Sequence, residues 1–235
     1  MVRSGIPGLD DVMGGGLIPK TSMLLNGSPG TGKSIFGLQF LIEGARKYNE
    51  PGVYITVEET VDDIRFCARQ LGWNIDELEQ KGLMTLVDPS QPILEGSVVS
   101  IEYISKIIAE KKAKRLVLDS LSLFQYMYSH TNTFKTEIIR FMRNMRSLGV
   151  TSIVISERAT PGVDDITYSP EDFLFQGMIV LMKLRMQASY ERCLNIVKYR
   201  GLDHSIRIHP FKISAGGITI LTDTTPFALS GGKDR

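Results

Sequence analysis

The chain has 235 residues and a formal net charge of +1 at pH 7, with 43% hydrophobic and 23% charged residues. This length suits one large domain with a sizeable core, and the near-zero charge gives no reason to expect nucleic acid or a membrane surface as a partner. The sequence contains no apolar run of membrane-spanning length and no apolar segment typical of a signal peptide. Cys67 and Cys193 argue against a disulfide framework and lack the spacing of metal ligands, so we expect a protein of the reducing cytoplasm.

The first predicted strand leads into a glycine-rich segment. Residues 5–20 are rich in Gly and Pro and predict a loop with a short helical turn near residues 9–13. Residues 22–26 predict a buried strand, and residues 35–47 predict a helix with a broad apolar face. Between this strand and helix lies Gly27-Ser28-Pro29-Gly30-Thr31-Gly32-Lys33-Ser34, which fits the pattern G-x-x-x-x-G-K-[ST] of a phosphate-binding loop.

The spacing within this loop has a physical reason. Without a Cβ, Gly27, Gly30 and Gly32 allow the backbone to curl tightly and to approach a ligand closely. Successive backbone N–H groups then form an anion nest, to which the following helix adds its positive end. Lys33 is placed to reach the β- and γ-phosphates, and the Ser34 hydroxyl is placed to bind Mg²⁺. All eight loop residues are therefore predicted to bind a nucleotide, and the competing interpretation is a glycine-rich turn that matches by chance.

After the loop, strands and helices alternate as far as residue 155. Thr60 is a candidate N-cap, and Asp63 three residues later supports the first turn of its helix. Gly72, Gly82 and Gly149 are expected to end helices. The predicted strands are 53–57, 84–87, 115–119 and 151–155, and the predicted helices are 61–71, 75–80, 98–112 and 134–148.

The pattern changes after a polar loop at residues 159–176, where strands follow one another without helices between them. This indicates an α/β fold with a mostly parallel central sheet, flanking helices and a C-terminal antiparallel extension. We expect a single domain over residues 1–235, with residues 222–235 as a flexible tail. The predicted strands of the extension are 178–186, 192–199, 206–213 and 217–221.

Three carboxylates that follow predicted strands are candidates for catalysis. Asp119 ends its strand, so its side chain is expected beside the phosphate loop at the carboxyl edge of the sheet, where it would orient Ser34 and the metal. The alternative is an Asp that caps a turn. Glu58 and Glu59 follow the next strand after the loop, and one of them is expected to polarise the attacking water while the other holds the first in place. The alternative is that both acids only stabilise the first turn of a helix, where negative charge is favourable.

One group of basic residues lies near the end of a predicted strand. Lys198 and Arg200 share one face of this strand, and His204 follows in the turn. Taken alone, this pattern favours charges that protect an edge strand from aggregation.

A second basic group lies on a predicted helix. Arg140, Arg143 and Arg146 are spaced to share one helix face. A solvent-exposed face is the default interpretation, and contact with nucleic acid or with another subunit is the alternative.

A series of short motifs runs in order through the chain. They are Gly5-Ile6-Pro7-Gly8-Leu9-Asp10, Gly14-Gly15-Gly16-Leu17, the phosphate loop, Pro51-Gly52-Val53-Tyr54-Ile55-Thr56-Val57-Glu58-Glu59-Thr60, Leu71-Gly72-Trp73, Leu118-Asp119-Ser120-Leu121 and Lys198-Tyr199-Arg200-Gly201. This series resembles a single domain of the KaiC family, whose members are ATPases of the RecA superfamily. The chain is more similar to the single-domain KaiC-like ATPases of archaea and bacteria than to the two-domain clock protein.

The resemblance implies a RecA-like P-loop fold and an ATPase that binds ATP with Mg²⁺. Such domains form hexameric rings of identical chains, with ATP at the subunit interfaces. Lys33, Ser34 and Asp119 would act on the ATP of their own chain, with Ser34 and Asp119 as metal ligands. Glu58 and Glu59 would be the paired catalytic carboxylates.

The resemblance also implies a role in trans for the basic residues near the end of the chain. Lys198, Arg200 and His204 keep the family's spacing K-x-R-x-x-x-H, whose members reach the nucleotide of the neighbouring chain. Lys198 or Arg200 would then stabilise charge on the transferring phosphoryl group. This implication replaces the edge-strand interpretation.

The sequence departs from the family in three respects. It carries one ATPase domain rather than two. Ser214-Ala215-Gly216-Gly217 replaces a segment that carries an Asp in the family, which puts nucleoside contacts there in doubt. It has no convincing counterpart of the clock protein's Ser-Thr autophosphorylation pair, so a circadian role is not inferred.

Three functional hypotheses remain open from the sequence. The first is a ring ATPase whose hydrolysis drives a conformational or signalling step towards a protein partner that the sequence does not identify. The second is a recombinase-like ATPase that binds DNA through residues 125–135 and 159–176, although the second loop is acidic and carries no Lys or Arg. The third is an autokinase, or a module in which ATP controls assembly with little turnover.

Overall fold

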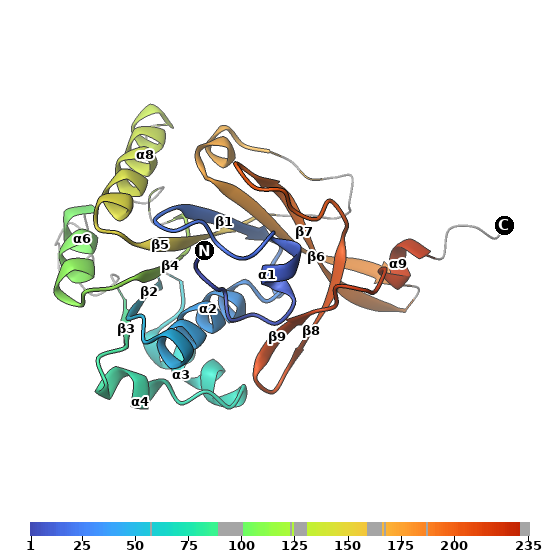
Figure 1. The fold of residues 1–235 in the computed structure, drawn as a ribbon, viewed down its shortest axis with the longest axis horizontal. Coiled ribbons are helices and arrows are strands. Elements are labelled where there is room, and N and C mark those ends of the chain that lie inside the picture. Colours follow the sequence, from blue (N-terminus) through green and yellow to red (C-terminus); the bar gives the residue numbers. More distant parts are fainter. Residues whose placement is uncertain are drawn as a thin grey trace.

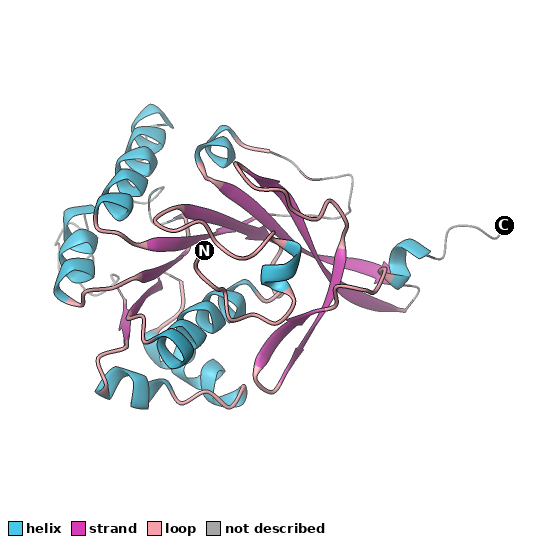
Figure 2. Cartoon of the chain, in the orientation of Figure 1, coloured by secondary structure: helices cyan, strands magenta, loops and turns pink. Residues whose placement is uncertain are grey.

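A central sheet with helices on both faces organises the molecule (Figure 1). α2, α3 and α4 lie on one side of the sheet, and α6 and α8 lie on the other (Figures 1 and 2). This arrangement confirms the predicted α/β class. The computed structural model describes residues 1–56, 58–88, 101–122, 124, 131–158, 166, 168–186 and 188–230.

The described part of the chain contributes nine strands to the sheet, in the order β3-β2-β4-β5-β1-β6-β7-β8-β9. Neighbouring strands are parallel from β3 to β6 and antiparallel from β6 to β9, as the change of pattern predicts. Their bounds are β1 Ser22–Gly27, β2 Gly52–Thr56, β3 Met84–Val87, β4 Arg115–Asp119, β5 Thr151–Glu157, β6 Gly177–Met186, β7 Ser189–Tyr199, β8 His209–Ser214 and β9 Gly217–Ile220.

The helices follow the predicted order with small shifts at their ends. α2 begins at Lys33, two residues before the expected start, because Gly32 of the loop already serves as its N-cap. Residues 98–100 of one predicted helix and Val57 of one predicted strand lie outside the described residues. The bounds are α1 Leu9–Val12, α2 Lys33–Tyr48, α3 Val61–Gln70, α4 Ile75–Gln80, α6 Ile101–Glu110, α8 Thr131–Ser147 and α9 Phe227–Ser230, with a 3₁₀ helix η1 at Pro170–Leu174.

Successive residues of the parallel strands supply two cores, one on each face of the sheet. Leu25 and Tyr54 are buried in the core that includes α2, α3 and α4, whereas Leu24 and Val53 are buried in the core that includes α6 and α8. Adjacent strand residues point to opposite faces, so a strand covered on both faces needs a continuous apolar run. This double burial holds the carboxyl ends of the parallel strands in place at one edge of the sheet.

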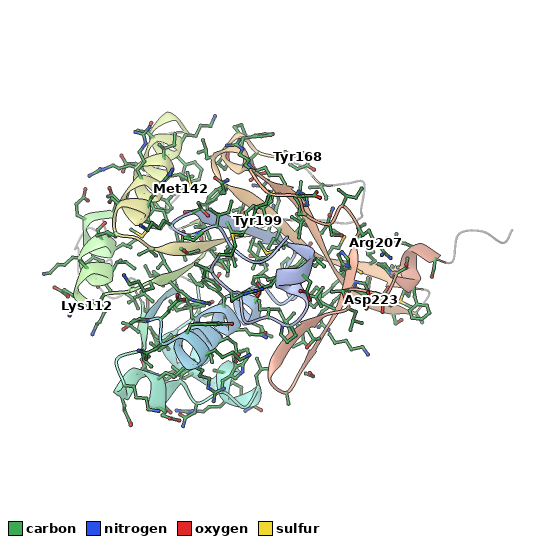
Figure 3. All side chains as sticks on the ribbon, viewed as in Figure 1. Lys112, Met142, Tyr168, Tyr199, Arg207 and Asp223 are labelled. Atoms are coloured by element: carbon green, nitrogen blue, oxygen red, sulfur yellow. The ribbon has the colours of Figure 1, made fainter. Side chains whose placement is uncertain are left out.

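The N-terminal loop is fastened to the sheet by Tyr199, which Figure 3 labels beside it. The Tyr199 hydroxyl donates a hydrogen bond to the Gly16 carbonyl (3.0 Å) and accepts one from the Ile18 N–H (2.6 Å). The expected short helical turn near residues 9–13 is present as α1. These two hydrogen bonds therefore tie the N-terminal loop to the end of β7.

The turn between β8 and β9 packs against α2 and the end of α3. The Gln39 side chain of α2 donates to the Ile218 carbonyl (3.1 Å) and accepts from its N–H (2.6 Å). A Cβ at Gly217, where φ is +104°, would lie 2.6 Å from Cζ2 of the buried Trp73, so this position requires glycine. The antiparallel extension is thus joined to the helix that follows the phosphate loop.

The residues after β9 are described as far as Ser230. α9 packs against β6, and the Ala228 N–H donates to the Glu191 carboxylate of β7 (3.2 Å). Residues 231–235 of the predicted flexible tail lie outside the described residues.

Candidate functional site

The phosphate loop joins β1 to α2 at the carboxyl edge of the sheet. Gly30 and Gly32 adopt φ values of +70° and +106°, which favour glycine, and the Thr31 N–H donates to the Ser28 carbonyl (3.3 Å). The loop opens into a cavity of about 350 Å³. The cavity is lined by residues of the loop and by residues at or after the ends of β2, β4 and β5, with further walls from α3, β7 and β8. Ligands of open α/β sheets bind at this edge.

Ser34 and Asp119 are brought together as the sequence predicts. The Ser34 hydroxyl donates to Asp119 Oδ2 over 2.8 Å, and the buried Tyr54 hydroxyl donates to the same oxygen over 2.5 Å. Burial raises the pKa of Asp119, while the hydrogen bonds from Tyr54 and Ser34 and the charge of Lys33 oppose that rise. A hydroxyl and a carboxylate oxygen side by side fit Mg²⁺, which takes few protein ligands and completes its shell with phosphate and water.

Lys33 points across the mouth of the loop. Its ammonium group donates to the Ser28 carbonyl (3.1 Å) and to Glu157 Oε1 (3.3 Å), and its side chain is 9% exposed. Sequence reasoning missed Glu157. The signal for it was its place two residues after a predicted strand; in the structure it is the last residue of β5, which lies next to β1.

Glu58 and Glu59 both line the cavity, but they are held differently. Glu58 Oε1 accepts hydrogen bonds from the hydroxyls of Ser120 and Ser122, each over 3.0 Å. The backbone of Glu59 is fixed by Thr56, whose hydroxyl donates to the Glu59 carbonyl (2.6 Å). The expected pair of carboxylates therefore lines the same cavity as the phosphate loop.

The pKa of Glu59 is raised above its usual value. Burial is the largest cause, and the negative charges of Asp119, Asp63 and Glu58 add to it. A carboxylate with a raised pKa is better suited to accept a proton than an ordinary Glu. Glu59 is thus the stronger candidate for a general base, and Glu58 is the more firmly anchored of the two.

The basic residues with the K-x-R-x-x-x-H spacing lie elsewhere. Lys198 Nζ donates to the Asp172 carbonyl (2.7 Å), and Arg200 Nη2 donates to the Phe173 carbonyl (2.8 Å). The His204 ring nitrogen Nδ1 lies 3.1 Å from the Ser205 carbonyl. Lys198, Arg200 and His204 are described residues, and none of them lines the phosphate-loop cavity of its own chain.

Two other cations of the extension lie at the phosphate loop or in its cavity, and sequence reasoning missed both. Lys183 Nζ donates to the Pro29 carbonyl at the tip of the loop (3.3 Å), and Arg192 lines the cavity. The two residues are cross-strand partners in β6 and β7. Nothing in the sequence signals this contact, because it depends on how the hairpin crosses the end of β1.

The basic face of α8 separates into two parts. Arg140 pairs with Glu137 (3.3 Å) on its own helix and with Glu102 of α6. Arg143 and Arg146 line a second cavity of about 230 Å³ together with Lys20. Both arginines are exposed, in keeping with the default interpretation of this face.

Fold and phosphate loop together define a RecA-like P-loop protein. A family model described as "ATPase: KaiC" matches residues 2–225, and the chain therefore belongs to the KaiC ATPase family. A KaiC-like protein from Pyrococcus horikoshii shares this fold in a crystal structure, with a TM-score of 0.81 and 32% sequence identity over 94% of this chain and 98% of that one.

Curated relatives are longer than this chain. The circadian clock oscillator protein KaiC of Prochlorococcus marinus is 34% identical over 92% of this chain and 45% of its own length. The corresponding protein of Synechococcus elongatus is 32% identical over 93% of this chain and 44% of its own length. The chain thus spans about half the length of these relatives. No helix in the described ranges has both the length and the apolar character that a membrane span requires.

Proposed function

We propose that the protein binds ATP with Mg²⁺ in the phosphate-loop cavity and hydrolyses it. The observation that carries this proposal is the 2.8 Å hydrogen bond between Ser34 and Asp119, in a cavity that Lys33 and two carboxylates also line. A glycine-rich turn that matched the motif by chance would not require a half-buried Asp from another strand at the Ser34 hydroxyl. P-loop ATPases use this combination to hold a metal and to position water.

Each residue has a chemical role in the proposed reaction. The loop N–H groups bind the phosphates, and Lys33 leaves Glu157 to pair with the β- and γ-phosphates. Mg²⁺, held by Ser34 and Asp119, would neutralise charge on the phosphates. Glu59 accepts a proton from the attacking water, while Glu58, anchored by Ser120 and Ser122, keeps the water in line.

We further propose a ring of identical chains, six by family resemblance, in which each cavity is completed by its neighbour. Lys198, Arg200 and His204 do not line the cavity of their own chain, which supports a role at the adjoining one. Cations supplied in this way stabilise the charge on the transferring phosphoryl group. Hydrolysis would then drive a conformational or signalling step towards a protein partner in the cytoplasm.

Phosphate release from ATP tests the enzymatic part of the proposal. K33A and E58Q/E59Q are expected to lose about 100-fold or more in rate, because they remove phosphate binding and general-base catalysis. K106A alters an exposed lysine on α6 and is expected to keep the wild-type rate. Wild-type rates in both K33A and E58Q/E59Q would refute the proposed function.

Light scattering with ATP, with ADP and without nucleotide tests the ring. We expect a hexamer with ATP together with measurable phosphate release. A nucleotide-dependent ring without phosphate release would favour the alternative in which ATP serves assembly alone. DNA binding that weakens steeply with salt would favour the recombinase-like alternative. Residues 125–130, 159–165 and 167 of its two candidate loops lie outside the described residues.

A further inference from the structure

The short helix η1 lies between β5 and β6, and its geometry depends on Asp172. This side chain is 2% exposed and accepts a hydrogen bond from the Ser169 N–H (2.8 Å), which closes the first turn of η1. Arg158, the residue directly after β5, donates to both oxygens of the same carboxylate, over 2.5 and 3.0 Å. A bidentate pair of this kind fixes orientation as well as distance. Figure 3 labels Tyr168, which precedes this segment, near the edge of the molecule.

Two consecutive carbonyl groups of η1 hold two cations at the end of β7, Lys198 within the strand and Arg200 directly after it. Lys198 Nζ donates to the carbonyl of Asp172 itself (2.7 Å), and Arg200 Nη2 donates to the carbonyl of Phe173 (2.8 Å). The Phe173 ring also lies against the Lys198 ammonium, 5.7 Å from its centroid. The direction of both carbonyls follows from the conformation of η1, and therefore from the Arg158–Asp172 pair.

A second tie holds the same two segments together. The Gln176 side chain donates to the Arg200 carbonyl (2.6 Å), and the Arg200 N–H donates to the Gln176 carbonyl (3.0 Å). The main chain of Arg200 is thus fixed independently of η1. The carbonyls of Asp172 and Phe173 in η1 therefore determine only where the Lys198 and Arg200 side chains lie.

The chemistry of these contacts preserves positive charge. Carbonyl oxygens are neutral acceptors, so they orient Lys198 and Arg200 without neutralising them, whereas the negative charge of Asp172 is matched by Arg158. Arg200 is exposed and Lys198 is half-buried, so both remain open to a ligand from outside the chain. Burial lowers the pKa of Lys198, and the positive charge of Arg200 lowers it further. An anion that approaches the two side chains would therefore stabilise the charged form of Lys198.

We propose that Asp172, held by Arg158, is the positioning residue for Lys198 and Arg200, and that it acts on hydrolysis in the adjoining protomer rather than in its own. This inference rests on the proposed function, because it requires a ring in which those two cations complete the neighbour's cavity. Asp172 itself touches no nucleotide in this arrangement. Its contribution is to aim two side chains, and a misplacement of about 1 Å in an active site costs roughly 100-fold in rate.

Mixed rings test in which protomer Asp172 acts. K33A disables a protomer's own cavity and leaves its cations intact, whereas K198A does the reverse. D172N alone is expected to lose at least about tenfold in ATP hydrolysis. When D172N is mixed one to one with K33A, the rings should regain activity. D172N protomers supply intact cavities and K33A protomers supply intact cations, and about a quarter of the interfaces in random rings join the two. Mixed with K198A, D172N should stay inactive, because neither protomer supplies a working pair of cations.

The opposite pattern would overturn the proposal. If Asp172 serves its own cavity, D172N is rescued by K198A and not by K33A. The mixture of K33A with K198A tests the ring by itself: no recovery there means that the cavities are not shared, and the proposed function fails independently of Asp172.

Two further variants exclude a general effect on folding. R158K keeps the charge but loses the bidentate geometry, so it should behave as D172N does in both mixtures. E171Q alters the adjacent carboxylate, whose oxygen lies 3.9 Å from Arg158, and should keep near wild-type activity. Loss of ring assembly in both D172N and R158K, measured by light scattering, would mean that the pair supports the interface and would overturn the proposal.

Discussion

Lys33 and Glu157 form an ion pair in which the ammonium Nζ lies 3.3 Å from the carboxylate Oε1. The lysine is 9% exposed and the glutamate 46% exposed, so a nearly buried cation is balanced by a carboxylate at the surface of the cavity. The same lysine is the group that the motif assigns to the phosphates. Glu157 therefore competes with a nucleotide for Lys33, and binding requires that this pair separates.

Replacing Glu157 by Gln is expected to tighten ATP binding about two- to fivefold, because an ion pair with an exposed partner contributes roughly 0–1 kcal/mol. Calorimetric titration with a non-hydrolysable analogue and Mg²⁺ measures the change. E110Q, an exposed acid on α6, serves as the matched control and should bind as the wild type does. Weaker binding by E157Q would contradict the competition between Glu157 and the phosphates.

Tyr54→Phe is expected to destabilise the nucleotide-free protein by about 1.5–3 kcal/mol. It removes a partly buried 2.5 Å hydrogen bond to the Asp119 carboxylate, and hydrogen bonds to charged groups fall in that range. Denaturant unfolding of both proteins measures the difference. Y168F removes the hydroxyl of a tyrosine that is 52% exposed and should change stability by less than about 0.5 kcal/mol. Equal effects of the two substitutions would argue against the Tyr54–Asp119 bond.

Glu59→Gln is expected to stabilise the protein at neutral pH. The pKa of Glu59 in the folded protein is raised above its usual value of 4.5. As the pH rises, the unfolded chain therefore releases this proton first, and the free energy of unfolding falls between the unfolded-state and the folded-state pKa. Gln has no proton to release, so the free energy of unfolding of E59Q does not fall in this way. Because the Glu59 side chain is only partly desolvated and water screens its interactions, the gain should stay below about 1 kcal/mol, or roughly 2–4 °C in Tm.

Thermal unfolding of the wild type and E59Q at pH 7.5 and pH 4 measures this effect. At pH 4 the two proteins should unfold at nearly the same temperature, because Glu59 is then mostly protonated in both states. A gain that persists unchanged at pH 4 would show that the substitution acts through something other than the Glu59 charge.

Thiol labelling at pH 8 is expected to separate the two cysteines. Burial raises the pKa of Cys193 to about 12, so it should react only after unfolding. Cys67 lines the phosphate-loop cavity, and burial and the charge of Glu59 raise its pKa, so it should react slowly. Mg²⁺ with an ATP analogue should slow Cys67 further. Mass spectrometry of labelled peptides follows each site, and an unchanged Cys67 rate under saturating analogue would argue against nucleotide in this cavity.

Features that depend on local sequence could be predicted from the residues. Thr60 and Asp63 form the expected cap, with the Thr60 hydroxyl accepting from the Asp63 N–H (3.2 Å) and Asp63 accepting in return from the Thr60 N–H. Gly72, Gly82 and Gly149 take the positive φ values that helix ends favour. Alternating strands and helices indicated the parallel sheet, because a parallel connection needs a crossover.

Contacts between distant segments could not be predicted in this way. That β1 pairs with β5 on one side and β6 on the other depends on long-range packing, and it determines that Glu157 reaches Lys33. The two hydroxyls that hold Glu58 belong to the loop after β4, some 60 residues away. Lys198 looked like a charge on an edge strand, because the carbonyl that holds it belongs to Asp172, 26 residues earlier.

Trp73 is the single tryptophan of the chain, and it is buried where the turn between β8 and β9 meets α2 and α3. Its indole is therefore an intrinsic fluorophore at a joint between the antiparallel extension and the helix that begins at the phosphate loop. Any movement of the extension against that helix would alter its emission without an attached dye. Stopped-flow mixing of the unlabelled protein with nucleotide can time such a movement directly.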